Sequence, residues 1–271
     1  MNGYARWLAA WLCCGFATAA CAAPPAGIEV VGSTTMAPLV SALAKRFEAL
    51  HPGTSVVVKP GGSARGIDDA RRGMADVGMV SRTLTDAEKD LTGFPIARDG
   101  VAFVVNKDNP VARLKSAELR DIYTGRITNW QQVGGAAAAI VVIKRDSGRG
   151  VIELFTHHFA LKESEIKAHK SAGDNSVALQ EVIDESRAIV FYSLGDAERK
   201  AQRGVHVKLL AVDGVSATAK NVRNSNYPIV RQLSLVTRQL PQGLAKQFID
   251  FCLSAQATDI VIEYDFVPYL D

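Results

Sequence analysis

The chain has 271 residues, a formal net charge of +3, 48% hydrophobic residues and 22% charged residues. These values are typical of a globular protein, and they exclude a disordered chain or a strongly basic nucleic-acid-binding chain. So small a net charge gives no indication of a polyanionic partner, and we expect no nucleic acid among the partners.

The N-terminal segment MNGYARWLAAWLCCGFATAACAAPP differs from the rest of the chain. Arg6 precedes an apolar run from Trp7 to Ala20, which is too short to cross a bilayer but suits a secretory signal. Cleavage after Ala20-Cys21-Ala22 predicts a signal peptide over residues 1–22 and a periplasmic protein. A second hypothesis is lipoprotein processing, with a lipid anchor on Cys21.

Strand and helix patterns alternate through the remainder of the chain. The expected strands are Ile28–Val31, Ser55–Lys59, Asp76–Val80, Val101–Asn106, Ile140–Lys144, Ala188–Ser193, Val205–Ala211 and Leu233–Thr237. The expected helices are Met36–Leu50, Arg65–Gly73, Ser116–Tyr123, Gly150–Phe159, Val177–Ser186 and Pro241–Ser254. This alternation predicts an α/β fold in which helices cover parallel or mixed sheets.

The sequence also predicts which residues of these elements are buried and where the last helix begins. Val101–Asn106 is continuously apolar, which predicts a strand buried on both faces. Within Met36–Leu50, the residues expected on the buried face are Leu39, Leu43, Phe47 and Leu50. Pro241 is expected to begin the last helix. Cys252, in that helix, is expected to be a buried thiol, since no other cysteine would remain after signal removal to form a disulfide.

Three strands end in turns rich in glycine and hydroxyl residues, and a helix follows each turn. The turns are Gly32-Ser33-Thr34-Thr35, Gly61-Gly62-Ser63 and Arg145-Asp146-Ser147-Gly148-Arg149-Gly150. A helix N-terminus presents unpaired N–H groups and a partial positive charge, to which hydroxyls and arginines add donors. One such serine or threonine usually only caps its helix, but three such turns indicate an anion site. Ser81-Arg82 adds a fourth polar strand end.

Motifs of other site classes are absent from the sequence. It contains no GxxxxGK[ST] phosphate loop, no GxGxxG after a strand, no GxSxG elbow and no HExxH. His157 and His158 are adjacent on an expected helix, so they point about 100° apart and are not placed to share a metal.

Several segments together carry a resemblance to a known family. GSTTMAPLV, PGGSARGIDDARRGMADVGMVSR, ARDGVAFVVN, LRDIYTGRITNWQQVGG and RDSGRG, in this order, resemble the phosphate-binding proteins of bacterial ABC importers. The resemblance implies a two-lobed, type II-like periplasmic binding protein with mixed sheets flanked by helices and an anion cleft between the lobes. With crossings near Val105-Asn106 and Asn226-Tyr227, lobe I would be 27–105 plus 228–271, and lobe II 106–227.

The resemblance also implies which residues bind the anion. Carried over by position, they are Ser33, Thr34, Thr35, Ser63, Ser81, Arg82, Arg145, Gly148 and Gly150. Arg149 and Ser147 are added as the residues expected to replace donors that the third loop has lost. The third loop of the family commonly reads Arg-x-x-Gly-Ser-Gly-Thr, whereas this chain has Arg149 and Val151 in place of the two hydroxyl residues.

One further residue is expected to set selectivity. Phosphate near neutral pH carries a proton that sulfate lacks, so a buried carboxylate acceptor favours phosphate over sulfate. One branch of the family has an aspartate where this chain has Ser81. We therefore expect Asp99 to be the acceptor here, with Asp146 as the alternative.

The function implied by the resemblance is non-enzymatic. The protein would be a monomer that captures inorganic phosphate and delivers it to ABC permease subunits in the inner membrane, without a cofactor or a metal. Three alternatives stay open. They are binding of another oxyanion such as molybdate, tungstate or sulfate, a hydrolase or transferase acting on a phosphorylated substrate, and a sensor or adhesion protein that has lost transport.

Overall fold

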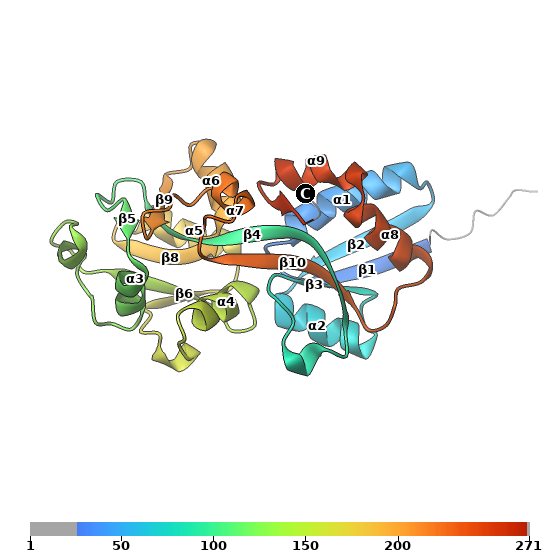
Figure 1. The fold of residues 1–271 in the computed structure, drawn as a ribbon, viewed down its shortest axis with the longest axis horizontal. Coiled ribbons are helices and arrows are strands. Elements are labelled where there is room, and N and C mark those ends of the chain that lie inside the picture. The colour runs from blue at the N-terminus through green and yellow to red at the C-terminus, as the bar shows by residue number, and fades with distance from the viewer. Residues whose placement is uncertain (1–25, 270–271) are drawn as a thin grey trace, which may run out of the picture.

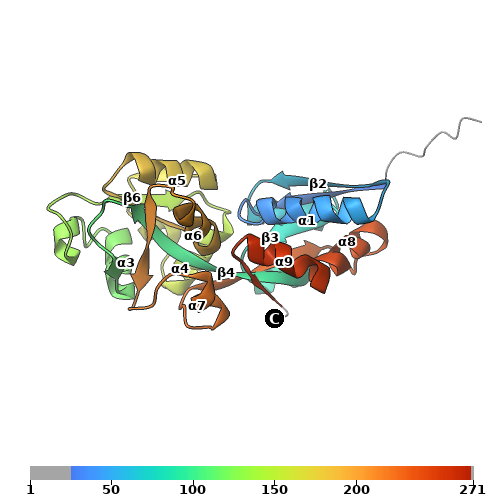
Figure 2. The ribbon, with the colours of Figure 1, turned by 90° about the horizontal axis from the view of Figure 1, so that it is seen from above.

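The computed structural model describes residues 26–269, which form an elongated molecule of two lobes (Figure 1). The expected signal peptide over 1–22, and Cys21 with it, lie outside the described residues. Two long strands run between the lobes, and each lobe has a sheet with helices on both faces (Figures 1 and 2).

Lobe I contains both the first and the last described segments. Its sheet runs in the order β2 (Thr54–Pro60), β1 (Ala26–Gly32), β3 (Val77–Val80), β10 (Val230–Thr237) and the first part of β4 (Thr92–Asn106), with β11 (Val267–Pro268) beside β4. Strand β1 is parallel to β2 and β3, and β10 is antiparallel to β3. One face packs on α1 (Ala37–Leu50), α8 (Gly243–Leu253) and α9 (Ala255–Glu263), and the other on α2 (Ser63–Arg72).

Lobe II is built on the second part of β4. The strands that complete its sheet are β8 (Ala188–Ser193), β6 (Val141–Arg145), β7 (Lys170–Ala172), β9 (Val207–Val212) and β5 (Arg113–Leu114). On one face pack α3 (Ser116–Tyr123), α4 (Gly150–His158) and α7 (Ala219–Arg223), and on the other α5 (Asn175–Asp184) and α6 (Leu194–Gln202). The first face includes an aromatic cluster in which the rings of Phe155 and Phe191 stack at 4.4 Å.

Strand β4 belongs to both lobes. Its residues 92–100 pair with β10, and its residues 101–106 pair with β8 and β9. The run from Val101 to Val105 is fully buried, which confirms the predicted burial on both faces. The change of partner at Gly100 precedes the crossing expected near Val105-Asn106, because the sheet of lobe II already begins at Val101.

Several expectations about individual elements were wrong. The apolar run starting at Val101 is only the second half of β4, which begins at Thr92. Pro241 lies before α8, which begins at Gly243. Leu50 is 52% exposed because it is the last residue of α1, where the helix passes the end of the core. The sequence analysis also missed α6, α7 and α9.

The prediction for Cys252 is confirmed. Its thiol is unpaired and buried in α8, among the apolar side chains of lobe I. Burial raises the pKa of this thiol well above its usual range, so it stays protonated and unreactive at neutral pH.

Candidate functional site

Strand ends from both lobes meet at one small pocket. Strands β1, β2 and β3 are parallel, so their carboxyl ends lie at one edge of the lobe I sheet. Strand β6 of lobe II ends opposite them at Arg145. The pocket is lined by Ser33, Thr34, Thr35, Gly62, Ser63 and Ser81 from lobe I and by Arg145, Arg149, Gly150, Val151 and Asn175 from lobe II.

Two helices begin at this pocket without a side-chain cap. Helix α2 starts at Ser63 after Gly62, and α4 starts at Gly150 after Arg149; neither preceding residue makes a capping hydrogen bond through its side chain. Gly62 has a φ of 97°, a backbone conformation that favours glycine. The positive ends of two helix dipoles therefore face the pocket, where an anion could accept from their N–H groups.

Buried hydroxyls form the lobe I wall. Ser33, Ser63 and Ser81 are all buried, and Ser63 Oγ lies 3.3 Å from Ser81 Oγ. The backbone N–H of Ser81 donates to Ser63 Oγ at 3.1 Å, and Ser33 Oγ accepts from the N–H of Met36 at 3.4 Å. These contacts fix the hydroxyls in place and leave donor capacity for a ligand.

Arg145 supplies a buried positive charge in the lobe II wall. Its guanidinium donates to the carbonyls of Ala172 and Gly173 and to Asn175 Oδ1, each at 2.9 Å. None of the carboxylates that the structure describes forms an ion pair with it. Burial lowers the pKa of Arg145 to about 10, so the group stays charged at neutral pH. A buried cation without a counter-charge favours an anionic ligand.

Arg149 adds a second cation with unused donor capacity. Its Nη1 is buried and has no hydrogen-bond acceptor, and the nearest carboxylate oxygen, Asp174 Oδ1, is 3.6 Å away. Because buried polar atoms normally have a partner, this nitrogen indicates that a ligand oxygen belongs beside it.

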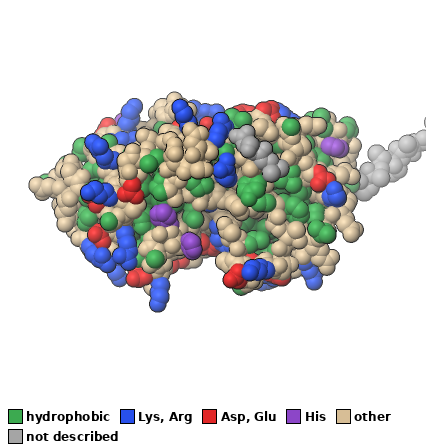
Figure 3. All heavy atoms as spheres, viewed as in Figure 1, with side chains coloured by type: hydrophobic (Ala, Val, Ile, Leu, Met, Phe, Trp, Pro, Cys, Tyr) green, Lys and Arg blue, Asp and Glu red, His purple; other side chains and the backbone are tan. Residues whose placement is uncertain are grey.

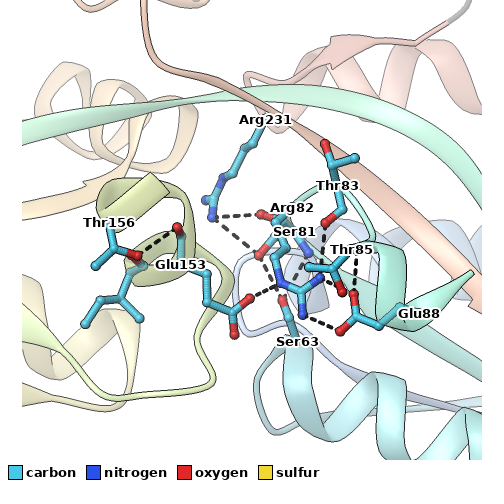
Figure 4. A network of polar contacts seen from close by, with 10 residues as sticks. Ser63, Ser81, Arg82, Thr83, Thr85, Glu88, Glu153, Thr156 and Arg231 are labelled. Atoms are coloured by element: carbon cyan, nitrogen blue, oxygen red, sulfur yellow. Dashed lines mark hydrogen bonds and ion pairs between the residues drawn. The ribbon is translucent and has the colours of Figure 1, made fainter. Parts of the chain in front are cut away.

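Arg82 does not line the pocket, although it was expected to contact the anion. Its guanidinium turns away and donates to both carboxylate oxygens of Glu88, at 2.7 and 2.8 Å, and to Glu153 on α4 (Figure 4). Glu88 is in lobe I and Glu153 in lobe II, so Arg82 forms an ion pair that bridges the two lobes.

Asp99 and Asp146, the expected acceptors, are also engaged elsewhere. Asp99 is buried behind the pocket, where its Oδ2 accepts from Arg231 at 2.7 Å and its Oδ1 from the N–H of Gly195 at 3.2 Å. Burial raises the pKa of Asp99, while the charge and hydrogen bonds of Arg231 oppose that rise. The carboxylate of Asp146 accepts from Ser171 Oγ. Neither carboxylate is placed to accept a proton from a ligand.

Two residues of the third loop lie beside the pocket and not in its lining. Ser147 Oγ donates to Glu163 at 2.7 Å, and the carbonyl of Gly148 accepts from the N–H of Ala64 in lobe I at 3.2 Å. The contribution of Gly148 is thus a backbone contact between lobes, made possible by its φ of 77°.

The sequence analysis missed Asn175 and Arg231, and it named Gly62 and Val151 in the loops without including them among the binding residues. Gly62, Val151 and Asn175 line the pocket, and Arg231 lies directly behind it. Asn175 follows Gly173-Asp174 at the start of α5, which repeats the turn-then-helix pattern of the other loops. Arg231 is a single charge within an apolar strand, and such a residue needs a buried partner.

The pocket is therefore built from donors. No Asp or Glu side chain lines it, and among residues 26–269 no cluster of His, Cys, Asp and Glu could hold a metal ion. On the molecular face in Figure 3, by contrast, side chains of both charges are interspersed. Within the described part of the chain, no helix has the length and apolarity needed to span a membrane.

Comparison with known proteins identifies the family. The model of a PBP superfamily domain matches residues 18–256. The chain belongs to the PBP superfamily. Among curated members, it is 30% identical to the phosphate-binding protein PstS of Bacillus subtilis over 249 residues, which cover 90% of this chain and 81% of the relative.

Solved structures agree with this assignment. A phosphate ABC transporter substrate-binding protein from Clostridium perfringens, with bound phosphate, matches this PBP superfamily member with a TM-score of 0.84 and 32% identity, covering 89% of this chain and 99% of that one. An ABC-type phosphate transport receptor from Vibrio cholerae matches with a TM-score of 0.74 and 31% identity over the same shares. The two-lobed α/β fold expected from the sequence is thereby confirmed.

Glu88 makes lobe I sensitive to acid. Although burial raises its pKa, hydrogen bonds from Arg82 and the N–H of Thr85 lower that pKa from 4.5 to about 2. A carboxylate with a lowered pKa stabilises the fold above its unfolded pKa and loses that contribution as pH falls. We expect the free energy of unfolding to fall between about pH 4.5 and pH 2. Denaturant titrations of wild type and Glu88→Gln should show a shallower fall for the variant; parallel curves would contradict the prediction.

Proposed function

We propose that this protein binds inorganic phosphate between its lobes and delivers it to the membrane subunits of an ABC importer, without acting as an enzyme. The observation that carries the proposal is the buried Arg145, which has no carboxylate partner in the described structure and faces hydroxyls and uncapped helix N-termini. Such a site balances the negative charge of a small tetrahedral anion with one buried cation and offers many hydrogen-bond donors to its oxygens. The names of the relatives from Bacillus and Clostridium support phosphate as that anion.

The proposed mechanism is closure of two lobes around the anion. Lobe I, proposed as 27–105 plus 228–271, would supply the hydroxyl wall, and lobe II, proposed as 106–227, would supply the arginines. The lobes are joined through β4 and β10, so they could rotate about these strands. Closure would present one joined surface to the importer. The signal peptide over 1–22 would export the chain to the periplasm.

Calorimetry on protein that has been unfolded and refolded to remove bound ligand tests the proposal. We expect one phosphate to bind per chain, and we expect no release of phosphate from a phosphorylated test substrate such as p-nitrophenyl phosphate. Absence of phosphate binding would refute the function, and steady hydrolysis would favour the alternative of a hydrolase.

The bridge from Arg82 to Glu153 predicts an effect on ligand release. Glu153→Gln removes the lobe II partner of Arg82 and leaves its lobe I partner Glu88 in place. Because these side chains are partly exposed, we expect only about a two- to tenfold loss of phosphate affinity, mainly through faster release. Stopped-flow release of phosphate to a fluorescent phosphate sensor measures this rate.

Glu88→Gln is the matched control for this bridge. It also removes a carboxylate partner of Arg82, but one that lies in the same lobe as Arg82. We therefore expect Glu88→Gln to lower the stability of lobe I and to accelerate phosphate release less than Glu153→Gln does. Equal release rates for Glu153→Gln and wild type would show that the bridge does not hold the closed form together.

A further inference from the structure

Arg231 lies behind the lobe I wall and has no donor left for a ligand. Its side chain is fully buried on β10, directly opposite Asp99 in the pairing with β4. A guanidinium has five N–H donors. Its five contacts are all to protein atoms: Asp99 Oδ2 at 3.1 and 2.7 Å, Thr35 Oγ1 at 3.2 Å, and Ser81 O and Oγ at 3.4 and 3.3 Å.

Two of these contacts are to hydroxyls that line the pocket. Arginine only donates, so Thr35 Oγ1 and Ser81 Oγ must accept from it (Figure 4 shows the contact to Ser81). A hydroxyl beside a cation turns its oxygen toward the charge and its proton away from it. For Thr35, the direction away from Arg231 is toward the pocket that Thr35 lines.

The paired serines give the same result whichever of them donates. If Ser63 donates to Ser81 Oγ, both acceptor positions of Ser81 are filled, by Ser63 and Arg231, and the Ser81 proton is left for the pocket. If Ser81 donates instead, both acceptor positions of Ser63 are filled, by the Ser81 hydroxyl and N–H, and the Ser63 proton is left. In both cases one hydroxyl proton of the pair stays available to an anion in the pocket.

Asp99 holds Arg231 in position. Its carboxylate accepts two hydrogen bonds from Arg231, and its other oxygen accepts from Gly195 at the beginning of α6 in lobe II. Asp99 therefore acts on the pocket through Arg231 and not by contact with the ligand.

We infer that Arg231 is a positioning residue that directs the hydroxyl proton of Thr35, and one hydroxyl proton of the Ser63–Ser81 pair, into the pocket, so that the site recognises a tetrahedral dianion by its acceptor oxygens and does not require a proton on the ligand. This inference rests on the proposed function. It follows that sulfate, which has the same shape and charge as the phosphate dianion and no proton, is not rejected.

The test is calorimetry with phosphate and with sulfate at one alkaline pH, where phosphate is a dianion. For wild type we expect the two affinities to agree within about tenfold. In the double variant Asp99→Asn/Arg231→Met, both buried charges are removed together, which limits the cost of an unpaired charge. Thr35 and Ser81 are then free to turn and accept the phosphate proton. We expect sulfate affinity to fall at least about tenfold more than phosphate affinity.

Thr35→Val is the matched control, because it removes one donor without freeing an acceptor. It should weaken both anions by a similar factor and leave their ratio unchanged. If the wild type binds phosphate but binds sulfate at least a hundredfold more weakly, the inference is overturned and the proposed function stands. Equal weakening of both anions in the double variant would show a structural role only, which also overturns it. If wild type binds neither anion, both the inference and the function fail. If the double variant does not fold, the ratio of phosphate affinity to sulfate affinity in the wild type alone supports or overturns the inference.

Discussion

Replacing Arg145 with Met should lower phosphate affinity by at least about thirtyfold. The substitution keeps most of the side-chain volume but removes the buried charge that has no carboxylate partner in the described structure. Loss of one member of a desolvated, hydrogen-bonded charge pair costs about 2–5 kcal/mol, and each 1.4 kcal/mol is tenfold in affinity. Calorimetry with phosphate measures the loss directly.

Arg238→Met is the control for this substitution, because Arg238 is exposed beyond the end of β10. It makes the same change of charge in the whole molecule and should leave the affinity unchanged. Equal affinities for the two variants would show that the anion does not bind beside Arg145.

Gly150→Ala should abolish tight binding while leaving each lobe folded. A Cβ at Gly150 would lie 2.6 Å from Ser81 Oγ, 2.7 Å from Ser63 Oγ and 2.9 Å from the Ser81 carbonyl, all atoms of the opposite lobe. Such distances are too short for a real contact, so the added methyl group should hold the lobes apart. Alanine suits a helix interior at least as well as glycine, and α4 itself should not be destabilised. We expect at least about a hundredfold loss of affinity, with a change below about 1 kcal/mol in the ligand-free stability.

Small-angle X-ray scattering with and without phosphate separates closure from binding in this variant. Wild type should contract when phosphate is added, and Gly150→Ala should not. Gly93→Ala is the matched control, since Gly93 is exposed in β4 and an added Cβ would meet only the flexible end of Leu84, at 3.3 Å. If Gly150→Ala contracts and binds phosphate as the wild type does, the lobes tolerate the methyl group and the predicted obstruction is wrong.

The loops of the pocket were predictable because their signals are local. A strand, a turn with glycine and hydroxyls, and a helix follow one another within a few residues, and parallel strands place such turns at one edge. Ser33, Ser63 and Arg145 were found in this way, and all three line the pocket.

The roles of Arg82, Asp99 and Arg231 were not predictable from local pattern. Arg231 and Asp99 are 132 positions apart in sequence and meet only because β10 pairs with β4 in one register. Arg82 is adjacent in sequence to the pocket residue Ser81, yet its ion pairs with Glu153 and Glu88 turn its side chain away from the pocket. Strand register and contacts between lobes determine these side-chain directions, and neither is encoded within a few neighbouring residues. A continuous apolar strand likewise gives no sign of where its partners change, so the switch of pairing after Gly100 in β4 was not predictable either.

The placement of both β1 and β11 in lobe I determines where a motion sensor must be attached. Labels fixed at the two ends of the described chain would both move with lobe I and report nothing when the lobes approach each other. An informative pair needs one dye on lobe I and one on an exposed residue of lobe II, such as Arg113 on β5. The two ends are not equivalent as attachment points, because Val267 of β11 packs against the core of lobe II, whereas β1 pairs only with strands of lobe I. A phosphate biosensor is therefore better immobilised through the end before β1, where the attachment lies away from the moving lobe.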